Sequence, residues 1–126
     1  MERRLISGHS PYESIVGFSR AVVAGDRVYV AGTAPIPADG SAPPDDAYEQ
    51  ARLCLEIIGE ALGRAGTALE NVVRTRVFVT DAAHFEGVGR AHGEVFADIR
   101  PANTTVVTSL LDPAWKVEIE AEAVLP

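Results

Sequence analysis

The clearest alternation of apolar and polar residues in this chain runs from Lys116 to Val124. A period of two predicts a strand, and its apolar face consists of Val117, Ile119, Ala121 and Ala123. The opposite face carries Lys116, Glu118, Glu120 and Glu122. Because three carboxylates in one row repel one another, a stable fold must hydrate them, pair them with cations, or use one of them chemically.

Further β segments are indicated by β-branched residues with turn residues beside them. Residues 104–110 form a predicted strand, and Asp112-Pro113 marks the turn that joins it to the alternating strand. Residues 2–6 form a short strand. Residues 17–35 contain two strands that meet in a hairpin turn at Gly25-Asp26.

A strong strand covers residues 71–80. Period two places Arg74, Arg76 and Phe78 on one face, and on the other face Val73, Thr75, Val77 and Val79. If this strand lies beside the row of glutamates, its two arginines form cross-strand ion pairs with them. In that alternative, most of these charged side chains stabilise the sheet and take no part in catalysis.

Two stretches repeat apolar residues every three or four positions, which predicts helices with one buried face. The first covers residues 46–65, with Asp45 or Asp46 as its N-cap and Gly66 just after its end. Its apolar stripe is Ala47, Ala51, Cys54, Leu55, Ile58, Ala61, Leu62 and Ala65. The stripe includes the only cysteine, so no intrachain disulfide can form and an inert thiol is expected.

The second helix covers about 82–98 and is capped by Thr80-Asp81. Its apolar face is Phe85, Val88, His92, Val95, Phe96 and Ile99. The place of His92 within this face favours a packed, hydrogen-bonded histidine over a catalytic one. His84 lies about 12 Å from it along the helix, too far for both rings to bind one metal ion.

The element order β-β-β-α-β-α-β-β predicts one α+β domain over residues 1–126. In this two-layer fold, two helices cover one face of a six-stranded mixed sheet. No linker, repeat or low-complexity segment divides the chain. A sheet that is covered on one face only favours self-association through the other face.

The composition narrows the classes of function. There are 11 Lys and Arg against 18 Asp and Glu, a formal net charge of −7, so no nucleic-acid partner is expected. Since the chain has no phosphate loop, dinucleotide fingerprint or cysteine–histidine cluster, we expect no cofactor and no metal. It also has no signal-peptide core and no membrane-spanning run, which indicates a cytoplasmic protein without membrane contact.

Two segments resemble the RidA/YjgF (L-PSP) family. Pro-Ala-x-Thr-x-Val at 101–106, followed by Lys-Val-Glu-Ile-Glu-Ala at 116–121, is similar to the C-terminal signature of that family. Residues 17–35 are similar to its pattern Tyr-Ser-x-Ala-Val…Gly…Val-Phe-Val-Ser-Gly-x-x-Pro. Phe18 stands where the family often has tyrosine, and Asn103 where active members have arginine. The chain is therefore identified as a divergent member that lacks the substrate-carboxylate arginine.

The resemblance implies a homotrimer with its sheets turned inward and with small-molecule clefts between subunits. Several members hydrolyse reactive enamines and imines. Glu118 matches the glutamate that orients a water there, and beside the Gly32 backbone it would act as the general base. The resemblance also implies substrate contacts by backbone groups near Gly32, Thr33 and Thr105, with Phe18 in the place of the family's tyrosine.

Asn103 cannot reproduce the arginine contact. Its amide offers two neutral N–H donors, whereas a guanidinium offers a charged, bidentate fork. The loss amounts to about 1.5–3 kcal/mol, or roughly ten- to a hundred-fold in binding of a carboxylate. Arg20 or Arg100 is a candidate substitute, since each flanks a matching motif. Otherwise the cleft accepts an uncharged or differently shaped ligand.

Two functions follow. The first is hydrolytic deamination of small enamines and imines, with a specificity altered by Asn103. The alternative is a non-catalytic trimeric protein that binds a small molecule in the same cleft. An endoribonuclease, the label attached to some relatives, suits the acidic chain poorly, because no histidine pair or lysine is placed for strand cleavage.

Overall fold

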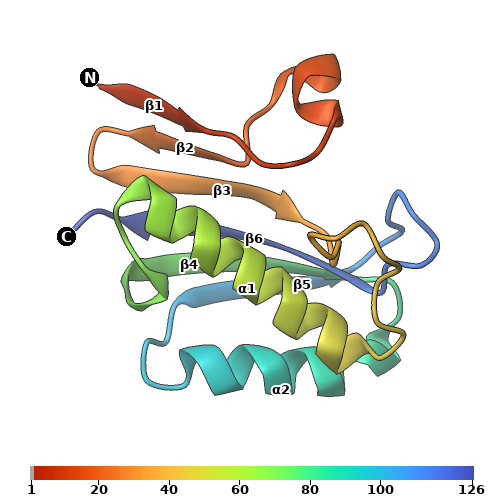
Figure 1. Ribbon diagram of the computed structural model, residues 1–126. Coiled ribbons are helices and arrows are strands. Elements are labelled where there is room, and N and C mark those ends of the chain that lie inside the picture. The colour runs from red at the N-terminus through yellow and green to blue at the C-terminus, as the bar shows by residue number, and fades with distance from the viewer. Residues whose placement is uncertain (1) are drawn as a thin grey trace.

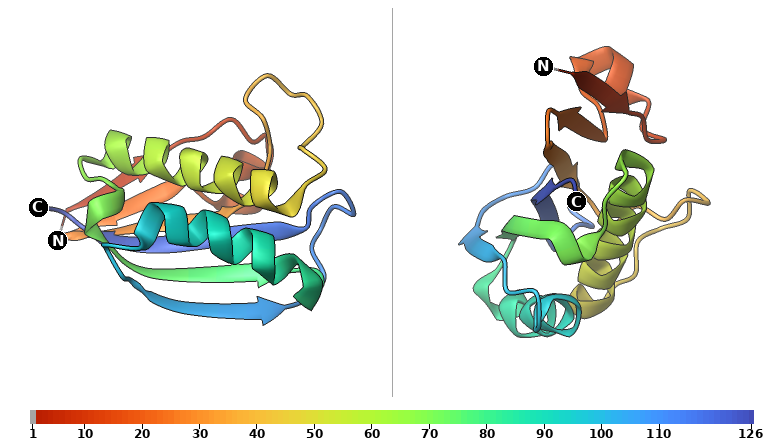
Figure 2. Two further views of the ribbon diagram at one scale, coloured as in Figure 1. Left: turned by 90° about the horizontal axis from the view of Figure 1, so that it is seen from below. Right: turned by 90° about the vertical axis from the view of Figure 1, so that its left-hand side faces the viewer.

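The computed structural model describes residues 2–126. Its six strands form one mixed sheet in the order β1-β2-β3-β6-β4-β5. The strands are Arg3–Ile6 (β1), Ala21–Ala24 (β2), Arg27–Thr33 (β3), Val72–Val79 (β4), Ala102–Val107 (β5) and Val117–Val124 (β6). Helices α1 (Ala47–Ala65) and α2 (Phe85–Phe96) pack on one face of the sheet, and the other face is open (Figures 1 and 2). This confirms the predicted two-layer α+β architecture.

Helix α1 has the caps that the sequence predicts. The carboxylate of Asp46 accepts a hydrogen bond from the backbone N–H of Glu49 at 3.1 Å. At the other end Gly66 adopts φ 95°, a left-handed conformation that costs glycine little. Every member of the predicted apolar stripe except the partly buried Ala47 is buried against the sheet.

Strand β6 is the central strand of the sheet, antiparallel to β3 on one side and to β4 on the other. Its four apolar residues are buried under the helices, as the alternation predicts. The glutamates point to the open face. The core therefore lies between this strand, its neighbours and α1, and the carboxylate row lies outside it.

The bounds expected for the strand before β6 were wrong. β5 covers Ala102–Val107 instead of 104–110, and in the sheet β4 lies between β5 and β6. β5 runs parallel to β4, so the chain must cross the end of β4 before it enters β6. The turn at Asp112 is present, and its carboxylate accepts a hydrogen bond from the N–H of Ala114 at 2.8 Å.

Two side chains do not lie where the sequence pattern places them. Val73 is 40% exposed, because the pairing of β4 with β6 shifts between Val72 and Arg74 and turns Val73 outward. Phe85 is 52% exposed at the first residue of α2. A 3₁₀ turn over Ala82–His84, capped by Asp81, precedes that helix and delays its start.

One element gave no signal in the sequence. A single helical turn covers Glu13–Gly17, above the ends of β1 and β2 (Figure 1). It buries no side chain, so it leaves no apolar period to detect. The carboxylate of Glu13 holds it in place by accepting from the backbone N–H of Gly8 at 2.9 and 3.1 Å.

Candidate functional site

The open face of the sheet carries the row of glutamates, and two of them are paired. Arg76 Nη1 lies 2.9 Å from Glu120 Oε1 and 3.3 Å from Glu122 Oε1. Arg74 lies 3.9 Å from Glu122. The predicted cross-strand ion pairs are therefore confirmed for these two glutamates. They follow from the antiparallel register of β4 and β6.

Glu118 is different. Its neighbour on β4 is Phe78, which offers no charge, and among residues 2–126 no cation lies within 4 Å of its carboxylate. Glu118 is half-buried. The sequence points to this glutamate by its place in a motif, and the structure distinguishes it from Glu120 and Glu122 because it forms no salt bridge with the described residues.

Gly32 makes room for this carboxylate. A Cβ atom at position 32 would overlap Glu118 Oε2. The contact arises where the pairing of β3 with β6 is irregular: Val30 pairs with Ala121 and Thr33 with Ile119, so β3 has one extra residue there. Bulges of this kind often lie beside active sites, where they redirect a side chain. The glycine at position 32 thus allows the carboxylate of Glu118 to lie close to the backbone of β3.

Arg20 lies just before β2 and contacts the same bulge. Its Nη2 donates to the backbone oxygen of Ala31 at 2.8 Å and to that of Gly32 at 2.6 Å. Its Nε is buried and, within the described chain, has no hydrogen-bond partner. Of the two arginines considered as substitutes for the family's arginine, Arg20 is the one that contacts Gly32.

The electrostatics of this site depend on burial and on one cation. Burial raises the pKa of Glu118; the charge of Arg20 opposes this rise, and that of Glu120 adds to it. Burial also lowers the pKa of Arg20, against the opposing charges of Glu13 and Glu118. A half-buried carboxylate with a raised pKa is a suitable general base near neutral pH.

Asn103 lies elsewhere. It pairs in register with Thr75, a buried residue on the helix-covered face, and its Nδ2 donates to Thr75 Oγ1 at 3.0 Å. The hydroxyl of Thr105 donates to Asn103 Oδ1 at 3.0 Å, and Thr75 Oγ1 lies 2.8 Å from His92 Nε2. The bond to Thr75 confirms the prediction of a packed, hydrogen-bonded His92. Since Glu118 points to the open face, Asn103 and Glu118 do not meet within one chain.

Of the remaining predicted site residues, Thr33 is buried and Phe18 is exposed beside a cavity. Thr33 is fully buried, and its hydroxyl donates to the oxygen of Ala31 at 2.8 Å, so neither its side chain nor its backbone is exposed to a ligand in the single chain. Phe18 lies beside a cavity of about 580 Å³ on the open face. The other residues that line this cavity are Arg3, Leu5, Glu13, Ser14, Gly17, Ser19, Val22, Tyr29, Val30 and Ala31.

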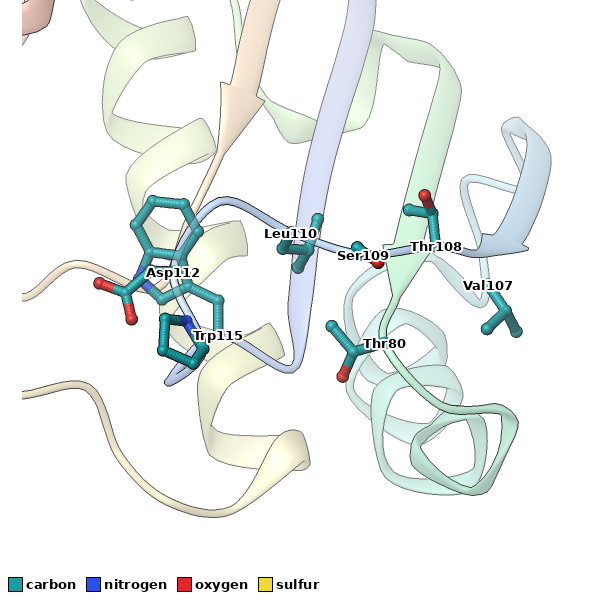
Figure 3. Close-up of a pocket in the computed structure, with 8 residues that line it drawn as sticks. Thr80, Val107, Thr108, Ser109, Leu110, Asp112 and Trp115 are labelled. Carbon is teal, nitrogen blue, oxygen red and sulfur yellow. The ribbon is translucent and has the colours of Figure 1, made fainter.

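A second cavity, of about 470 Å³, was not predicted. It lies where the loop after β5 passes the end of β4, with Asp112 and Trp115 at one end and Val107 at the other (Figure 3). Thr80, Thr108, Ser109, Leu110 and Pro113 complete its lining. Neither Glu118 nor Asn103 lines either cavity.

The next two observations concern metal binding and membrane insertion. Across residues 2–126, no three His, Cys, Asp or Glu side chains gather closely enough to hold a metal ion. Over the same residues, no helix has the length and apolar character needed to span a membrane. The cytoplasmic location stays a prediction.

Comparison with known proteins gives consistent matches. A family model described as Endoribonuclease L-PSP matches residues 8–125. A crystal structure from Mycobacterium tuberculosis, of a member of the YjgF family, is 44% identical with a TM-score of 0.89, covering 98% of this chain and 100% of that one. An uncharacterized protein of Streptomyces coelicolor is 43% identical over 122 residues, covering 96% of this chain and 90% of its own. A goat protein named 2-iminobutanoate/2-iminopropanoate deaminase is 33% identical over 123 residues, covering 97% and 90%.

Proposed function

This chain belongs to the endoribonuclease L-PSP family, which includes the RidA and YjgF proteins, and from that premise we propose that it hydrolyses small reactive enamines and imines. The observation that carries the proposal is Glu118, a half-buried carboxylate that packs against a glycine and forms no salt bridge with any of residues 2–126. The name of the goat relative, an imine deaminase, supports the reaction class.

In the proposed reaction Glu118 is the general base. It takes a proton from water as the oxygen attacks the carbon of the protonated imine, and the C=N electron pair moves to the nitrogen, which gives a neutral carbinolamine. That proton then passes from Glu118 to the nitrogen. As the C–N bond breaks, the hydroxyl proton goes to Glu118 and then to the departing ammonia, so a carbonyl compound and ammonium leave. A carboxylate whose pKa is raised by burial suits both steps, because it accepts a proton readily and returns it at neutral pH.

The binding cleft is proposed to lie between subunits of a homotrimer. Glu118 and Gly32 lie on the open face, while Asn103 and Thr105 lie on the other face of the edge strand β5. One ligand can contact both groups only if they come from different copies of the chain. Phe18, partly exposed beside Ala31, would contribute to the wall of that cleft.

The preferred substrate is proposed to lack a carboxylate. Asn103 provides no charge, and its Nδ2 already donates to Thr75. Arg20 is a poor replacement for the family's arginine, because its Nη2 already donates to two backbone oxygens. A guanidinium binds a carboxylate through two parallel N–H groups, and each such pair includes an N–H of Nη2. A bidentate contact to a carboxylate would therefore break a bond to the bulge.

The test is ammonia release from imines generated enzymatically, either from amino acids or from amines that have no carboxylate. We expect the wild type to accelerate hydrolysis, with the amine-derived imines preferred, and Glu118→Gln to lose about 10²–10⁴-fold. Glu120→Gln is the matched control, since Glu120 is occupied by Arg76. A wild-type rate equal to that of buffer across the whole panel would contradict the proposal.

A non-catalytic binding protein is the alternative, and the hydrogen bonds that hold Asn103 to Thr75 and Thr105 favour it. It predicts that a ligand raises the melting temperature without turnover. Asn103→Arg should then increase deaminase activity, and no gain would count against a cleft arranged as in active relatives. Nuclease activity is disfavoured by the net charge of −7.

A further inference from the structure

Arg20 binds the β3 bulge with both its main chain and its side chain. Its backbone oxygen accepts from the N–H of Ala31 at 3.0 Å. Its guanidinium donates to the oxygens of Ala31 and Gly32. Arg20 thus binds the N–H and oxygen of Ala31 and the oxygen of Gly32. These bonds fix the orientation of the Gly32 peptide.

This orientation matters because the bulge decides what faces Glu118. The residue opposite the carboxylate must be Gly32 for the carboxylate to fit, since any Cβ there would overlap Oε2. A regular β3 without the extra residue would shift every later residue of the strand to the other face. Holding the bulge therefore holds the space that Glu118 occupies.

The charge of Arg20 also acts on Glu118. The charged groups that act on the pKa of this carboxylate are Arg20, which precedes β2, and Glu120 on its own strand. Below the sheet, Cys54 of α1 has a thiol whose pKa is raised far above its ordinary value by burial, so it adds no charge. Glu13 faces Arg20 from the helical turn. Arg20 and Glu118 form no ion pair within 4 Å, so the interaction is a field acting over a longer distance.

We propose that Arg20 is a positioning residue of this site, which holds the Ala31–Gly32 backbone in place for Glu118 and supplies a positive charge beside that carboxylate. The catalytic meaning of this role rests on the proposed hydrolysis, but the role itself is a property of the folded protein. It differs from a substrate clamp, for which Arg20 would need a free pair of parallel N–H groups.

The experiment is a titration of the Glu118 carboxyl carbon by NMR in the purified protein, together with the amide resonances of Gly32 and Thr33. In Arg20→Met we expect the midpoint of Glu118 to move up by roughly one pH unit and both amide resonances to shift. In Arg20→Lys the charge remains, so the midpoint should stay near the wild-type value while the amides shift. Arg27→Met, at the far end of β3, is the matched control and should change neither.

Arg20→Gln is included in case Arg20→Met does not fold, since its amide can still donate to one backbone oxygen while the charge is lost. It should raise the midpoint as Met does. An unchanged Glu118 midpoint and unchanged Gly32 and Thr33 amides in either neutral variant would overturn the proposal. Because these measurements need no substrate, they separate a failure of this inference from a failure of the imine hydrolysis.

Discussion

Gly32 and Glu118 share one small volume, in which the missing side chain of one residue accommodates the carboxylate of the other. A favourable alternative for a strand would be a β-branched residue at position 32 and a salt bridge at position 118. The part of the chain that the structure describes has neither. Residues that weaken a fold locally are expected at functional sites. Gly32 and Glu118 form such a pair on the open face of the sheet.

Replacement of Gly32 by alanine tests this pairing. Gly32→Ala should displace the Glu118 carboxylate, lower hydrolytic activity at least tenfold, and cost about 1–3 kcal/mol through overpacking. In a Glu118→Ala background the obstacle is gone, so the same substitution should cost less. Urea unfolding of the four proteins measures the coupling, and strict additivity of the two changes would contradict the pairing.

The raised pKa of Glu118 gives stability a predictable pH dependence. The folded protein holds this proton more tightly than the unfolded chain, so the stabilisation is fully present below the unfolded-state pKa and is lost as pH rises through the folded-state value. At pH 7 the ionised group opposes folding. Glu118→Gln should therefore raise the melting temperature at pH 7 by roughly a few °C, and the gain should fade below about pH 4.

The control for that measurement is Glu120→Gln, which loses a salt bridge to Arg76 and should not stabilise the protein. A lower melting temperature for Glu118→Gln at pH 7 would show that the carboxylate is stabilised by its surroundings. The expected result combines lost activity with gained stability, which purely structural glutamates do not show.

At the residue scale, the sequence points to Glu118 but does not show what Asn103 contacts within its own chain. The alternation of β6 and the motif around it point to Glu118 directly. The position of Asn103 depends on the register of a parallel pair, in which it faces Thr75. No local pattern encodes that register, so the hydrogen bonds of Asn103 to Thr75 and Thr105 could not be predicted.

At the element scale, the pairing of β4 with β6 explains how a strand with three glutamates is tolerated in the middle of a sheet. The arginines of β4 lie opposite Glu120 and Glu122 in an antiparallel register. The side chains of these ion pairs are partly exposed, so each pair contributes little to the free energy of unfolding. Their main effect is to relieve repulsion within the row.

Arg76→Met tests this explanation. It removes the contacts to both Glu120 and Glu122 and should lower the melting temperature by roughly 1–3 °C at low salt. The difference from wild type should shrink in 1 M NaCl, where the screening length is about 3 Å. Arg74→Met is the matched control: its one contact is 3.9 Å long, so it should have a smaller effect. Equal losses in both variants would contradict the assignment.

The elements themselves were largely predictable, because their signals are local. The caps and apolar period of α1, the hairpin at Gly25 and the alternation of β6 all lie within short stretches of sequence. The strand order was not predictable from these signals, since it depends on which distant strands pair. The bulges at Val72–Arg74 and Val30–Thr33 were missed for the same reason, because a bulge exists only relative to a partner strand.

At the scale of the whole molecule, the open face of the sheet carries partly exposed apolar side chains among the charges. They include Leu5, Phe18, Tyr29, Val73 and Val106. Apolar residues on an uncovered sheet favour association with other copies. The separation of Glu118 and Asn103 onto two faces of the sheet leads to the same expectation, since only an assembly can bring them to one ligand.

We therefore expect a trimer in sedimentation velocity at micromolar concentration. Tyr29→Lys should reduce the trimer fraction without loss of secondary structure, because a lysine there lies opposite Glu122 and is tolerated by the single chain. Leu111→Lys is the control, as Leu111 is 95% exposed on a loop and should have no effect. A monomeric wild type would contradict the proposed cleft.

The central place of β6 also has a consequence for biosynthesis. β3 and β4 both depend on β6 for their pairing, yet β6 is the last of the six strands to leave the ribosome. Until then the nascent chain holds two unjoined halves, each with an unsatisfied edge. The complete sheet therefore cannot form until β6 has been synthesised, and a chain that stops before β6 would expose two unpaired strand edges that favour aggregation.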